Sequence, residues 1–370
     1  MKNIKLLAVF TVLMLILAAC TSDADTTTTA PADAGGSDTT AAAVEEDMGS
    51  LLDEVQARGS LKCGTRDALT GFAVLTDAGE HVGFDSDFCR VIAAAVLGDA
   101  EAVEHVDLET ADRFTALQSG QVDLLSRNTT WTAGRDGNEG ATFLTVTYYD
   151  GQGMMVSADS GFTSITGMDG VIVCVAKGTT TEGNAAAEAS RLGVAWEVRP
   201  FDDNALIQEA FDAGQCDGWS ADSSALTGIR ADQPGGPESV LILPEVFSKE
   251  PLAPLVLDGD SAWAQAVDWA ILATIQAEEW GITSANVDTF LTDEDDRIVK
   301  FLGGEFEDGD GNVATFDPGL GLPVDFAYQV IKQVGNYGEI FDRHLTPLGL
   351  ERGVNALWVD GGLMYSPPYR

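Results

Sequence analysis

Two stretches of the chain repeat one order of elements, and this order constrains the fold more than any other feature. In the first, a helical pattern ends at Gly120 and a short apolar run follows, Val122 to Leu125. In the second, a helical pattern ends at Gly214 and leads into the run Gln215 to Trp219. Glycine suits the position after a helix because it adopts the left-handed conformation without strain. Each joint has the form Gly-Gln-x-Asp before a strand, which favours two lobes built on similar α/β plans.

Strand and helix patterns alternate around both joints. Further strands are expected at the apolar runs 61–64, 103–106, 171–175 and 195–198, and helices are expected at 261–279 and 326–333. This alternation predicts mainly parallel sheets flanked by helices. Glycines at 151 and 153 and the proline at 251 suit two hinge strands between the lobes. We therefore predict that residues 51–152 and 250–370 form lobe 1 with a C-terminal extension, and that 153–249 form lobe 2.

The first residues have the pattern of an export signal. Lys2 and Lys5 precede an apolar run that is shorter than the roughly 20 residues of a membrane span. The run ends in Leu17-Ala18-Ala19-Cys20, which resembles the bacterial lipoprotein box. The resemblance implies that residues 1–19 are removed and that Cys20 carries two acyl chains, which suffice for stable anchoring. A plain signal peptide with an incidental cysteine is the alternative.

Residues 20–50 are dominated by Thr, Asp, Ala, Gly and Ser and contain no aromatic side chain. Such a segment buries too little apolar surface to offset the entropy of ordering, so it predicts a flexible tether. The chain as a whole has 59 acidic and 20 basic residues, a net charge of −39. This charge argues against nucleic acid or an anionic membrane surface as a partner. We expect membrane attachment only through the lipid, at the outer face of the cytoplasmic membrane.

Beyond Cys20 the chain has an even number of cysteines, which in an exported protein suggests disulfides. Three pairings are open, and we favour Cys63–Cys89 and Cys174–Cys216 because each pair falls within one predicted lobe. A metal site is the competing interpretation. It is disfavoured because the cysteines lack Cys-x-x-Cys spacing and because the histidines, His81, His105 and His344, are isolated in the sequence. We expect neither a metal nor a cofactor.

Three separate places supply complementary polar groups. Arg135 closes a polar run after the strand at 122–125, and its guanidinium matches a carboxylate. Gly178-Thr179-Thr180 stands at a strand-to-helix turn, where free N–H groups and the helix dipole attract anions. Asp222 follows another strand and can accept from an ammonium group. Each feature alone has an ordinary structural role. Together they describe a receptor for an α-amino acid, whose side chain could be covered by Phe72, Trp131, Tyr148 or Tyr149.

Several motifs carry a more specific resemblance. They are the runs 83–90, 113–120, 127–132, 147–153, 244–245, 248–252, 334–339, 355–358 and 361–363. The chain from Leu51 onward resembles the general L-amino-acid-binding proteins of polar amino acid ABC importers, which are extracellular solute-binding proteins of the family 3 type. The resemblance implies a monomer with the type II two-lobe periplasmic-binding-protein fold, which closes on its ligand by hinge motion.

The resemblance also implies a role for individual residues. Arg135 would bind the α-carboxylate, together with Gly178, Thr179 and Thr180, and Asp222 would bind the α-amino group. The remaining positions of the implied set are Asn128 and Thr130 as backbone or hydroxyl contacts, and Phe72 as the aromatic over the ligand. The partners implied are a free L-amino acid and the permease subunits of an importer.

Two other classes of function share this fold. The chain has no P-loop, so the ATPase of an importer would be a separate protein. A dehydratase-type enzyme would need a general acid against a leaving hydroxyl, for which Glu182 is the nearest candidate. A sensor would present the same amino-acid site to a receptor instead of a permease. We favour a binding protein that is not an enzyme.

Overall fold

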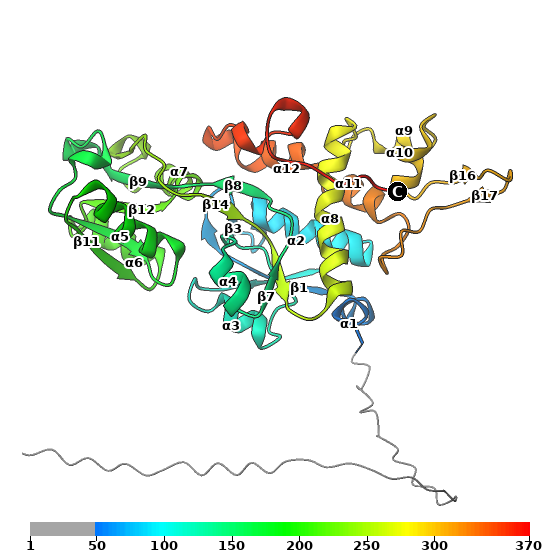
Figure 1. The fold of residues 1–370 in the computed structure, drawn as a ribbon, viewed down its shortest axis with the longest axis horizontal. Helices are drawn as coiled ribbons and strands as arrows, with labels where there is room; N and C mark the ends of the chain where they lie inside the picture. The colour runs from blue at the N-terminus through cyan, green and yellow to red at the C-terminus, as the bar shows by residue number, and fades with distance from the viewer. Residues whose placement is uncertain (1–48) are drawn as a thin grey trace, which may run out of the picture. The chain divides into compact units, whose positions relative to one another are not determined.

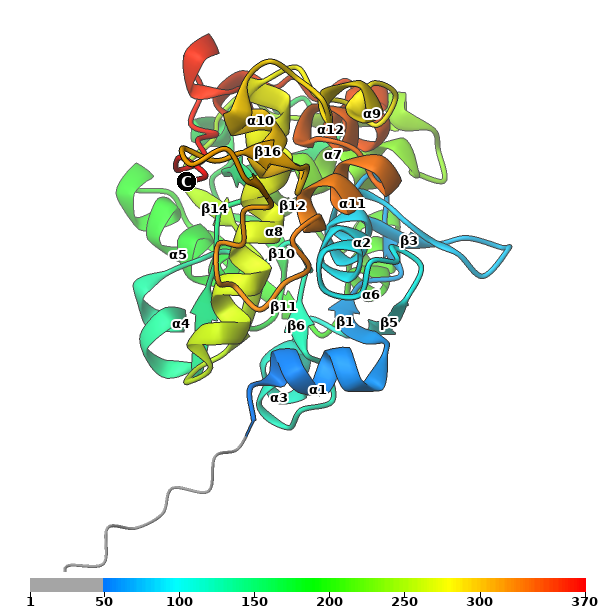
Figure 2. The same cartoon turned by 90° about the vertical axis from the view of Figure 1, so that its right-hand side faces the viewer.

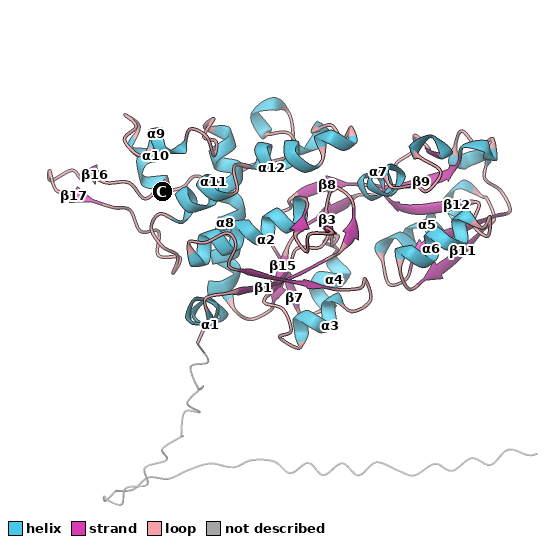
Figure 3. Cartoon of the chain, turned by 180° about the vertical axis from the view of Figure 1, so that it is seen from behind, coloured by secondary structure: helices cyan, strands magenta, loops and turns pink. Residues whose placement is uncertain are grey.

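The computed structural model describes residues 49–370. The predicted signal peptide, the predicted lipidation site Cys20 and most of the predicted tether lie outside the described residues. Residues 49–370 contain two five-stranded sheets, which lie in separate lobes of the structure (Figure 1). Figure 3 shows helices packed against the strands of both sheets. The fold is therefore the predicted α/β fold with two lobes.

The sheet of the first lobe has the strand order β5-β1-β6-β15-β7. Its strands are β1 (Leu61–Thr65), β5 (Val103–Asp107), β6 (Leu124–Leu125), β7 (Ala141–Phe143) and β15 (Leu255–Leu257). β1 runs parallel to both β5 and β6, as the alternation of strands and helices predicts. β15 returns from the other lobe and pairs antiparallel with β6 and β7.

The sheet of the second lobe has the order β11-β10-β12-β9-β13. Its strands are β9 (Gln152–Ser157), β10 (Val171–Ala176), β11 (Trp196–Phe201), β12 (Gly218–Asp222) and β13 (Val240–Ile242). β10 runs parallel to β11 and β12, whereas β9 pairs antiparallel with β12 and β13. Both sheets thus share one plan: a parallel trio is followed by one antiparallel strand, β15 or β9, and then by an edge strand, β7 or β13, that runs in the direction of the trio.

Two strands connect the lobes. β8 (Tyr148–Asp150) and β14 (Glu250–Leu252) pair antiparallel, with Asp150 opposite Glu250 (Figure 1). Glycine and proline predicted crossings at these places, and the chain passes between the sheets here. The lobe boundaries at residues 152 and 249 remain a prediction at the level of single residues.

A layer of helices builds the largest core of the first lobe. It consists of α2 (Phe84–Leu97), α8 (Ser261–Glu279), α11 (Phe326–Gln333) and α12 (Tyr337–His344), which contact one another (Figure 2). α8 has the predicted bounds because its apolar stripe is continuous, and it buries Trp263, whose Nε1 donates to the Asp123 carbonyl at 3.0 Å. α2 begins after Gly83, where φ is 140° and an added Cβ would lie 2.1 Å from the Phe72 carbonyl oxygen.

The second lobe has apolar clusters on both faces of its sheet. Val171, Val173 and Val175 of β10 pack on one face, and Cys174 packs on the other, because alternate residues of a strand point to opposite sides. The helices of this lobe are α5 (Thr180–Leu192), α6 (Asn204–Asp212) and α7 (Ser223–Ala231).

The remaining elements are short. The helices are α1 (Leu51–Arg58), α3 (Arg113–Gln118), α4 (Ala133–Asn138), α9 (Val287–Phe290) and α10 (Asp296–Phe301). The strands are β2 (Ala68–Leu69), β3 (Ala73–Leu75), β4 (His81–Val82), β16 (Phe306–Glu307) and β17 (Val313–Ala314). Single 3-10 turns lie at Ala158–Ser160, Ile165–Gly167, Pro237–Ser239, Thr346–Leu348, Gly353–Asn355 and Trp358–Asp360. Within residues 49–370, no helix combines the length and apolar character needed to cross a membrane.

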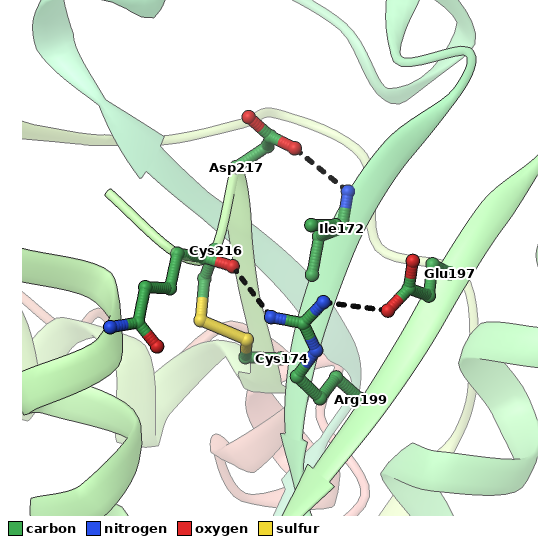
Figure 4. The surroundings of a disulfide bond; sticks show 7 residues. Ile172, Cys174, Glu197, Arg199, Cys216 and Asp217 are labelled. Atoms are coloured by element: carbon green, nitrogen blue, oxygen red, sulfur yellow. Dashed lines mark hydrogen bonds and ion pairs between the residues drawn. A yellow bond between two sulfur atoms is a disulfide. The ribbon is translucent and has the colours of Figure 1, made fainter. Parts of the chain in front are cut away.

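Each lobe contains one of the cysteine pairs favoured from the sequence. Cys63 of β1 is joined to Cys89 of α2, with Cα atoms 5.9 Å apart. Cys174 of β10 is joined to Cys216, with Cα atoms 5.8 Å apart. Around the second bond, the Arg199 guanidinium donates to the carbonyl of Gln215 and to Glu197, which lies on the same strand as Arg199, β11 (Figure 4). These contacts hold the turn that precedes β12.

Candidate functional site

A cleft lies where strands of both sheets end. It encloses about 520 Å³ of space between the lobes, open solvent at its mouth included. Ligands of α/β sheets commonly bind outside the carboxyl ends of strands, and this cleft has that position. The lining residues come from both lobes: Arg66, Thr110, Arg113, Arg127, Asn128, Thr130, Arg135, Ala176, Thr179, Thr180, Thr181, Asn204, Trp219, Ser220, Ala221, Asp222 and Ala225.

Most of the residues proposed from the sequence line this cleft. They are Asn128, Thr130 and Arg135 from the first lobe, and Thr179, Thr180 and Asp222 from the second. The two lobes meet at the hydroxyl groups of Thr130 and Thr180, whose oxygens are 3.5 Å apart. Phe72 and Gly178 are not among the lining residues.

Arg135 is positioned by the short helix α4. Thr132 caps this helix, because its hydroxyl accepts the Arg135 backbone N–H at 3.2 Å. The side chain turns back, so that Nη1 donates to the carbonyl of Thr130 at 2.9 Å. Burial lowers the pKa of Arg135, but neighbouring carboxylates, Glu250 and Asp222 first, oppose this shift. In residues 49–370 the Thr130 carbonyl is the one hydrogen-bond acceptor of this guanidinium, so further donors remain for a ligand.

Asn128 holds the polar loop after β6 in an uncommon conformation. Its φ is 32°, in the left-handed region that asparagine tolerates better than most residues. The Asn128 N–H donates to Asp85 at 2.7 Å, and its side-chain oxygen accepts from Arg66 at 3.3 Å. Burial raises the pKa of Asp85 to about 7, although the hydrogen bond from the Asn128 N–H acts to lower it. The loop is therefore anchored by a buried carboxyl group of α2.

The start of α5 forms the wall of the second lobe. The Thr179 hydroxyl accepts the Glu182 N–H at 3.4 Å and so caps the helix. Gly178 has a φ of 70°, and its N–H donates to the Glu182 carboxylate at 3.1 Å. The Gly178 N–H, which was expected to meet a ligand, thus already has an acceptor. The predicted role of Gly178 therefore has no support from the geometry. Thr180, the first residue of α5, donates its hydroxyl to Glu250 at 2.8 Å.

Asp222 ends β12 and precedes α7. Its side chain is 7% exposed and makes no capping bond to the helix. No hydrogen-bond donor to its carboxylate is found in the part of the chain that the structure describes. Burial raises its pKa well above the usual value, and the nearby carboxylates of Asp150 and Glu250 raise it further. A buried carboxylate without a donor is stabilised either by a proton or by a cationic ligand.

The carboxylates of the connecting strands were not predicted as part of the site. Asp150 accepts the backbone N–H of Gly151 at 2.8 Å and also bonds to Ser224, and burial raises its pKa to about 6. Glu250 accepts from Asn184 at 2.7 Å and from Ser248 at 2.6 Å, in addition to Thr180. Asp150 and Glu250 each stand beside a place where the sequence predicts a crossing between the lobes. This position in the sequence was the signal that could have pointed to them.

Arginines of the first lobe also escaped prediction. Arg127 supports the side of the cleft that the first lobe forms, because its guanidinium donates to the Leu108 carbonyl at 2.8 Å and to the Thr110 hydroxyl at 3.0 Å. Arg113 is 3% exposed, and its buried Nε has no hydrogen-bond partner within residues 49–370. Burial lowers the pKa of Arg113 to about 9, so it stays charged at neutral pH. Arg66 directly follows β1, a position at a strand end that could have drawn attention to it.

The aromatic residues proposed as ligand contacts have structural roles. Phe72 is 1% exposed and packs edge-on against Tyr148 and Phe84, with ring centroids 5.7 and 6.0 Å apart. Phe72 therefore belongs to the aromatic core of the first lobe in this structure. Trp131 stacks on Phe143 at 6.1 Å and is 40% exposed, outside the set that lines the cleft.

The histidines are close in space although they are far apart in the sequence. They line one hollow on the first lobe, where His81 and His105 stack with centroids 4.6 Å apart and His344 bonds to Asp87 at 2.7 Å. No group of three or more metal-ligating side chains suited to a metal ion occurs in residues 49–370.

Comparisons with known proteins place the whole folded part in one group. The model of the bacterial extracellular solute-binding proteins, family 3, matches residues 61–347. The general L-amino acid-binding periplasmic protein AapJ of Rhizobium johnstonii is 45% identical over 86% of this chain and 92% of its own. The glutamate/glutamine/aspartate/asparagine-binding protein BztA of Rhodobacter capsulatus is 44% identical over 87% of this chain and 94% of its own.

A solved structure agrees with these relatives. The ABC transporter periplasmic binding protein from Brucella ovis, with glutathione bound, has a TM-score of 0.82 and 42% identity, covering 87% of this chain and all of that one. The family model extends over both sheets and the cleft between them. The chain belongs to the bacterial extracellular solute-binding proteins of family 3.

Proposed function

We propose that this protein captures L-amino acids between its two lobes and delivers them to the permease subunits of an ABC importer driven by a separate ATPase. One observation carries the proposal. A guanidinium with unused donors, that of Arg135, shares the cleft with the carboxylate of Asp222, which has no donor among the described residues. These are the two charges that an α-amino acid complements.

The α-carboxylate would bind to Arg135 and to the start of α5. The first N–H groups of a helix have no intrahelical acceptor, and the helix dipole favours negative charge there. Thr179 and Thr180 bring this helix start into the cleft, opposite Thr130 of the other lobe. Because the ligand would join groups from both lobes, binding would stabilise the closed arrangement.

The α-amino group would bind to Asp222. An ammonium group supplies the donors that this carboxylate lacks, and it compensates the negative charges of Asp150 and Glu250 nearby. Asn128 and Thr130 would add polar contacts from the loop after β6. With charge-assisted hydrogen bonds of about 1.5–3 kcal/mol each, micromolar affinity, about −8 kcal/mol, is within reach.

The side-chain end of the cleft favours acceptor groups. Arg66 and Arg113 line it, and the buried Nε of Arg113 has no partner within residues 49–370. Carboxylate and amide side chains would fit these donors better than ammonium groups. The relative from Rhodobacter capsulatus is named for glutamate, glutamine, aspartate and asparagine, which have such side chains.

We further propose that the protein is exported, acylated at Cys20 and monomeric. The lipoprotein pattern at residues 17–20 supports this proposal. Mass spectrometry of the N-terminal peptide tests it, because an acylated Cys20 adds the mass of lipid. Release of a Cys20→Ala variant from membranes is the expected companion result. A free N-terminus at another residue would contradict it.

Binding rather than catalysis is the better account of the cleft. Glu182, the general acid considered from the sequence, lies outside the lining residues and accepts the Gly178 N–H instead. No other feature of the described residues favours a dehydratase, and the choice between an importer and a receptor as partner rests on the family resemblance.

Calorimetry with the twenty L-amino acids tests the proposed function. We expect saturable binding with glutamate or glutamine among the tightest ligands. Arg135→Ala should weaken that binding at least about tenfold, since a charge-assisted bond is lost. Arg297→Ala is the matched control, because Arg297 is exposed and pairs with Asp295 on the C-terminal extension.

Either of two results would contradict the proposal. If no amino acid binds or raises the melting temperature, the proposed function is wrong. If Arg135→Ala binds with unchanged affinity, the assignment of the carboxylate site is wrong.

A further inference from the structure

A second hollow, here called the side groove, adjoins the amino-acid cleft. It is lined by Asp67, Ala68, Leu69, Thr70, Val74, Asn204, Ala205, Gln208, Trp219, Ile229 and Asp232. Asn204 and Trp219 line both the side groove and the cleft, so the two spaces share a wall. Like the cleft, the side groove takes its lining from both lobes, from β2 and β3 on one side and α6, β12 and α7 on the other.

The shared wall offers a polar atom without a partner. Trp219 is 1% exposed, and its buried indole Nε1 has no hydrogen-bond acceptor within residues 49–370. A buried donor without an acceptor is unfavourable, and an acceptor on a ligand would remove this cost. Indole N–H groups donate only, so the matching group is a carbonyl or another oxygen.

The chemistry changes from the cleft to the side groove. The cleft has the guanidinium groups of Arg66, which donates to Asn128, and of Arg113, whose buried Nε has no hydrogen-bond partner within residues 49–370. The side groove has the apolar side chains of Leu69, Val74, Ala205 and Ile229. Its charged residues, Asp67 and Asp232, are acidic, so a carboxylate placed there would be repelled.

We propose that the cleft and the side groove together hold one class of ligand, γ-glutamyl amides with an uncharged substituent on the amide nitrogen. The amino-acid end occupies the cleft, the γ-carbonyl oxygen meets the donors of Arg66, Arg113 and Trp219, and the substituent lies among the apolar side chains. This inference rests on the proposed amino-acid site and extends its range of ligands beyond the common amino acids.

Calorimetry with three probes tests the inference. L-glutamine fills the cleft alone, N5-ethyl-L-glutamine adds an apolar substituent, and γ-L-glutamylglycine adds a carboxylate. We expect N5-ethyl-L-glutamine to bind within about threefold of L-glutamine or more tightly, because a buried CH₂ group contributes about 0.8 kcal/mol. We expect γ-L-glutamylglycine to bind at least about tenfold more weakly than the ethyl amide, because of Asp67 and Asp232.

A pair of neighbouring substitutions locates the substituent. Ala205 lines the side groove, whereas Leu206 is the next residue of α6, 42% exposed and outside both sets of lining residues. Ala205→Trp should weaken N5-ethyl-L-glutamine at least about tenfold and leave L-glutamine within about twofold. Leu206→Trp should leave both ligands within about twofold.

The outcomes separate this inference from the proposed function. If N5-ethyl-L-glutamine binds more than about tenfold more weakly than L-glutamine, or if Ala205→Trp weakens both ligands equally, the inference is overturned while amino-acid binding stands. Loss of binding for every L-amino acid in the unsubstituted protein would instead overturn the proposed function, and the inference with it.

Discussion

Asp222 shows how a single side chain can be kept ready for a ligand. It is buried near two other acidic groups, Asp150 and Glu250, and lacks a hydrogen-bond donor within residues 49–370. Arg135 and Arg113 oppose the rise of its pKa, but burial is the larger effect. Asp150 and Asp222, whose pKa values are both raised, retain a proton more strongly than isolated carboxylates do. In the free protein, that proton occupies the role that we assign to the ammonium group of a ligand.

Ligand binding should therefore release a proton. The raised pKa values mean that the free cluster binds a proton to higher pH than isolated carboxylates do, and an arriving ammonium group displaces it. The affinity for the ligand should rise with pH until the carboxyl groups of the cluster have lost their proton, and it should level off above that pH. The pKa of Asp150, one member of the cluster, is about 6. Calorimetry near pH 5 in buffers of small and large ionisation enthalpy should show release of about one proton.

The matched variants are Asp150→Asn and Asp296→Asn. Asp150→Asn should reduce the proton release, because it removes one charge from the cluster. Asp296, on α10 of the C-terminal extension, provides the control. Equal binding enthalpies in both buffers would show that Asp222 is already ionised in the free protein, contrary to this account.

At the scale of elements, the sequence predicted helices better than short strands. α8 and α11 have the predicted bounds, since an apolar stripe over several turns marks both ends of a helix. The strand expected at 215–219 is instead Gly218–Asp222. Cys216 is held by its disulfide and Asp217 accepts the Ile172 N–H, so the ladder begins only at Gly218. Asp222 accordingly lies at the strand end itself.

The same difference explains which site residues could be predicted. Arg135, Thr180 and Asp222 stand in local motifs that follow strands, and it is their combination that points to an α-amino acid. Arg113 and Trp219 lie within ordinary helix and strand patterns, and only tertiary packing brings them to the cleft. Phe72 is buried and does not line the cleft in this structure, because a large aromatic in a loop can pack inward as readily as over a ligand.

Helix α7 approaches the loop between β2 and β3 through a glycine. An added Cβ at Gly228 would lie 2.3 Å from the carbonyl oxygen of Thr70, in the other lobe. Gly228→Ala should therefore weaken ligand binding, because it holds the lobes apart, with little loss of stability in the free protein. Gly183→Ala on α5 is the control, since no atom lies within 4 Å of its added Cβ.

Both substitutions gain about 1 kcal/mol of helix propensity, so the comparison isolates the contact between lobes. Titration calorimetry and thermal unfolding of both variants provide the measurements. Equal affinities for the two variants would mean that the contact at Thr70 has no part in closure.

At the scale of the whole molecule, charge is the dominant feature. The 370-residue sequence has a net charge of −39, and charge of one sign creates repulsion between the acidic groups of the fold. Several ion pairs within residues 49–370 lie at the surface, such as Lys177–Asp202 and Lys332–Asp288, and pairs of this kind contribute at most about 1 kcal/mol each. The fold is thus stabilised mainly by its apolar cores and disulfides, against its own charge.

Salt should consequently stabilise the protein. Raising sodium chloride from about 0.01 to 1 M shortens the Debye length from about 30 to 3 Å, which screens the repulsion. The melting temperature should rise by several degrees. Choline chloride at the same ionic strength is the control, and an equal rise would assign the effect to screening rather than to bound sodium. A flat or falling melting temperature would contradict the expectation.

The two disulfides have a mechanical consequence for the hinge closure that the proposed function requires. Cys63–Cys89 joins β1 to α2, and Cys174–Cys216 joins β10 to the turn before β12, so each covalent link begins and ends in the same half of the molecule. Neither one spans the joint at β8 and β14. An oxidising environment can therefore stiffen each lobe through its own disulfide without restricting the movement between the lobes. One molecule can open and close repeatedly with both disulfides intact.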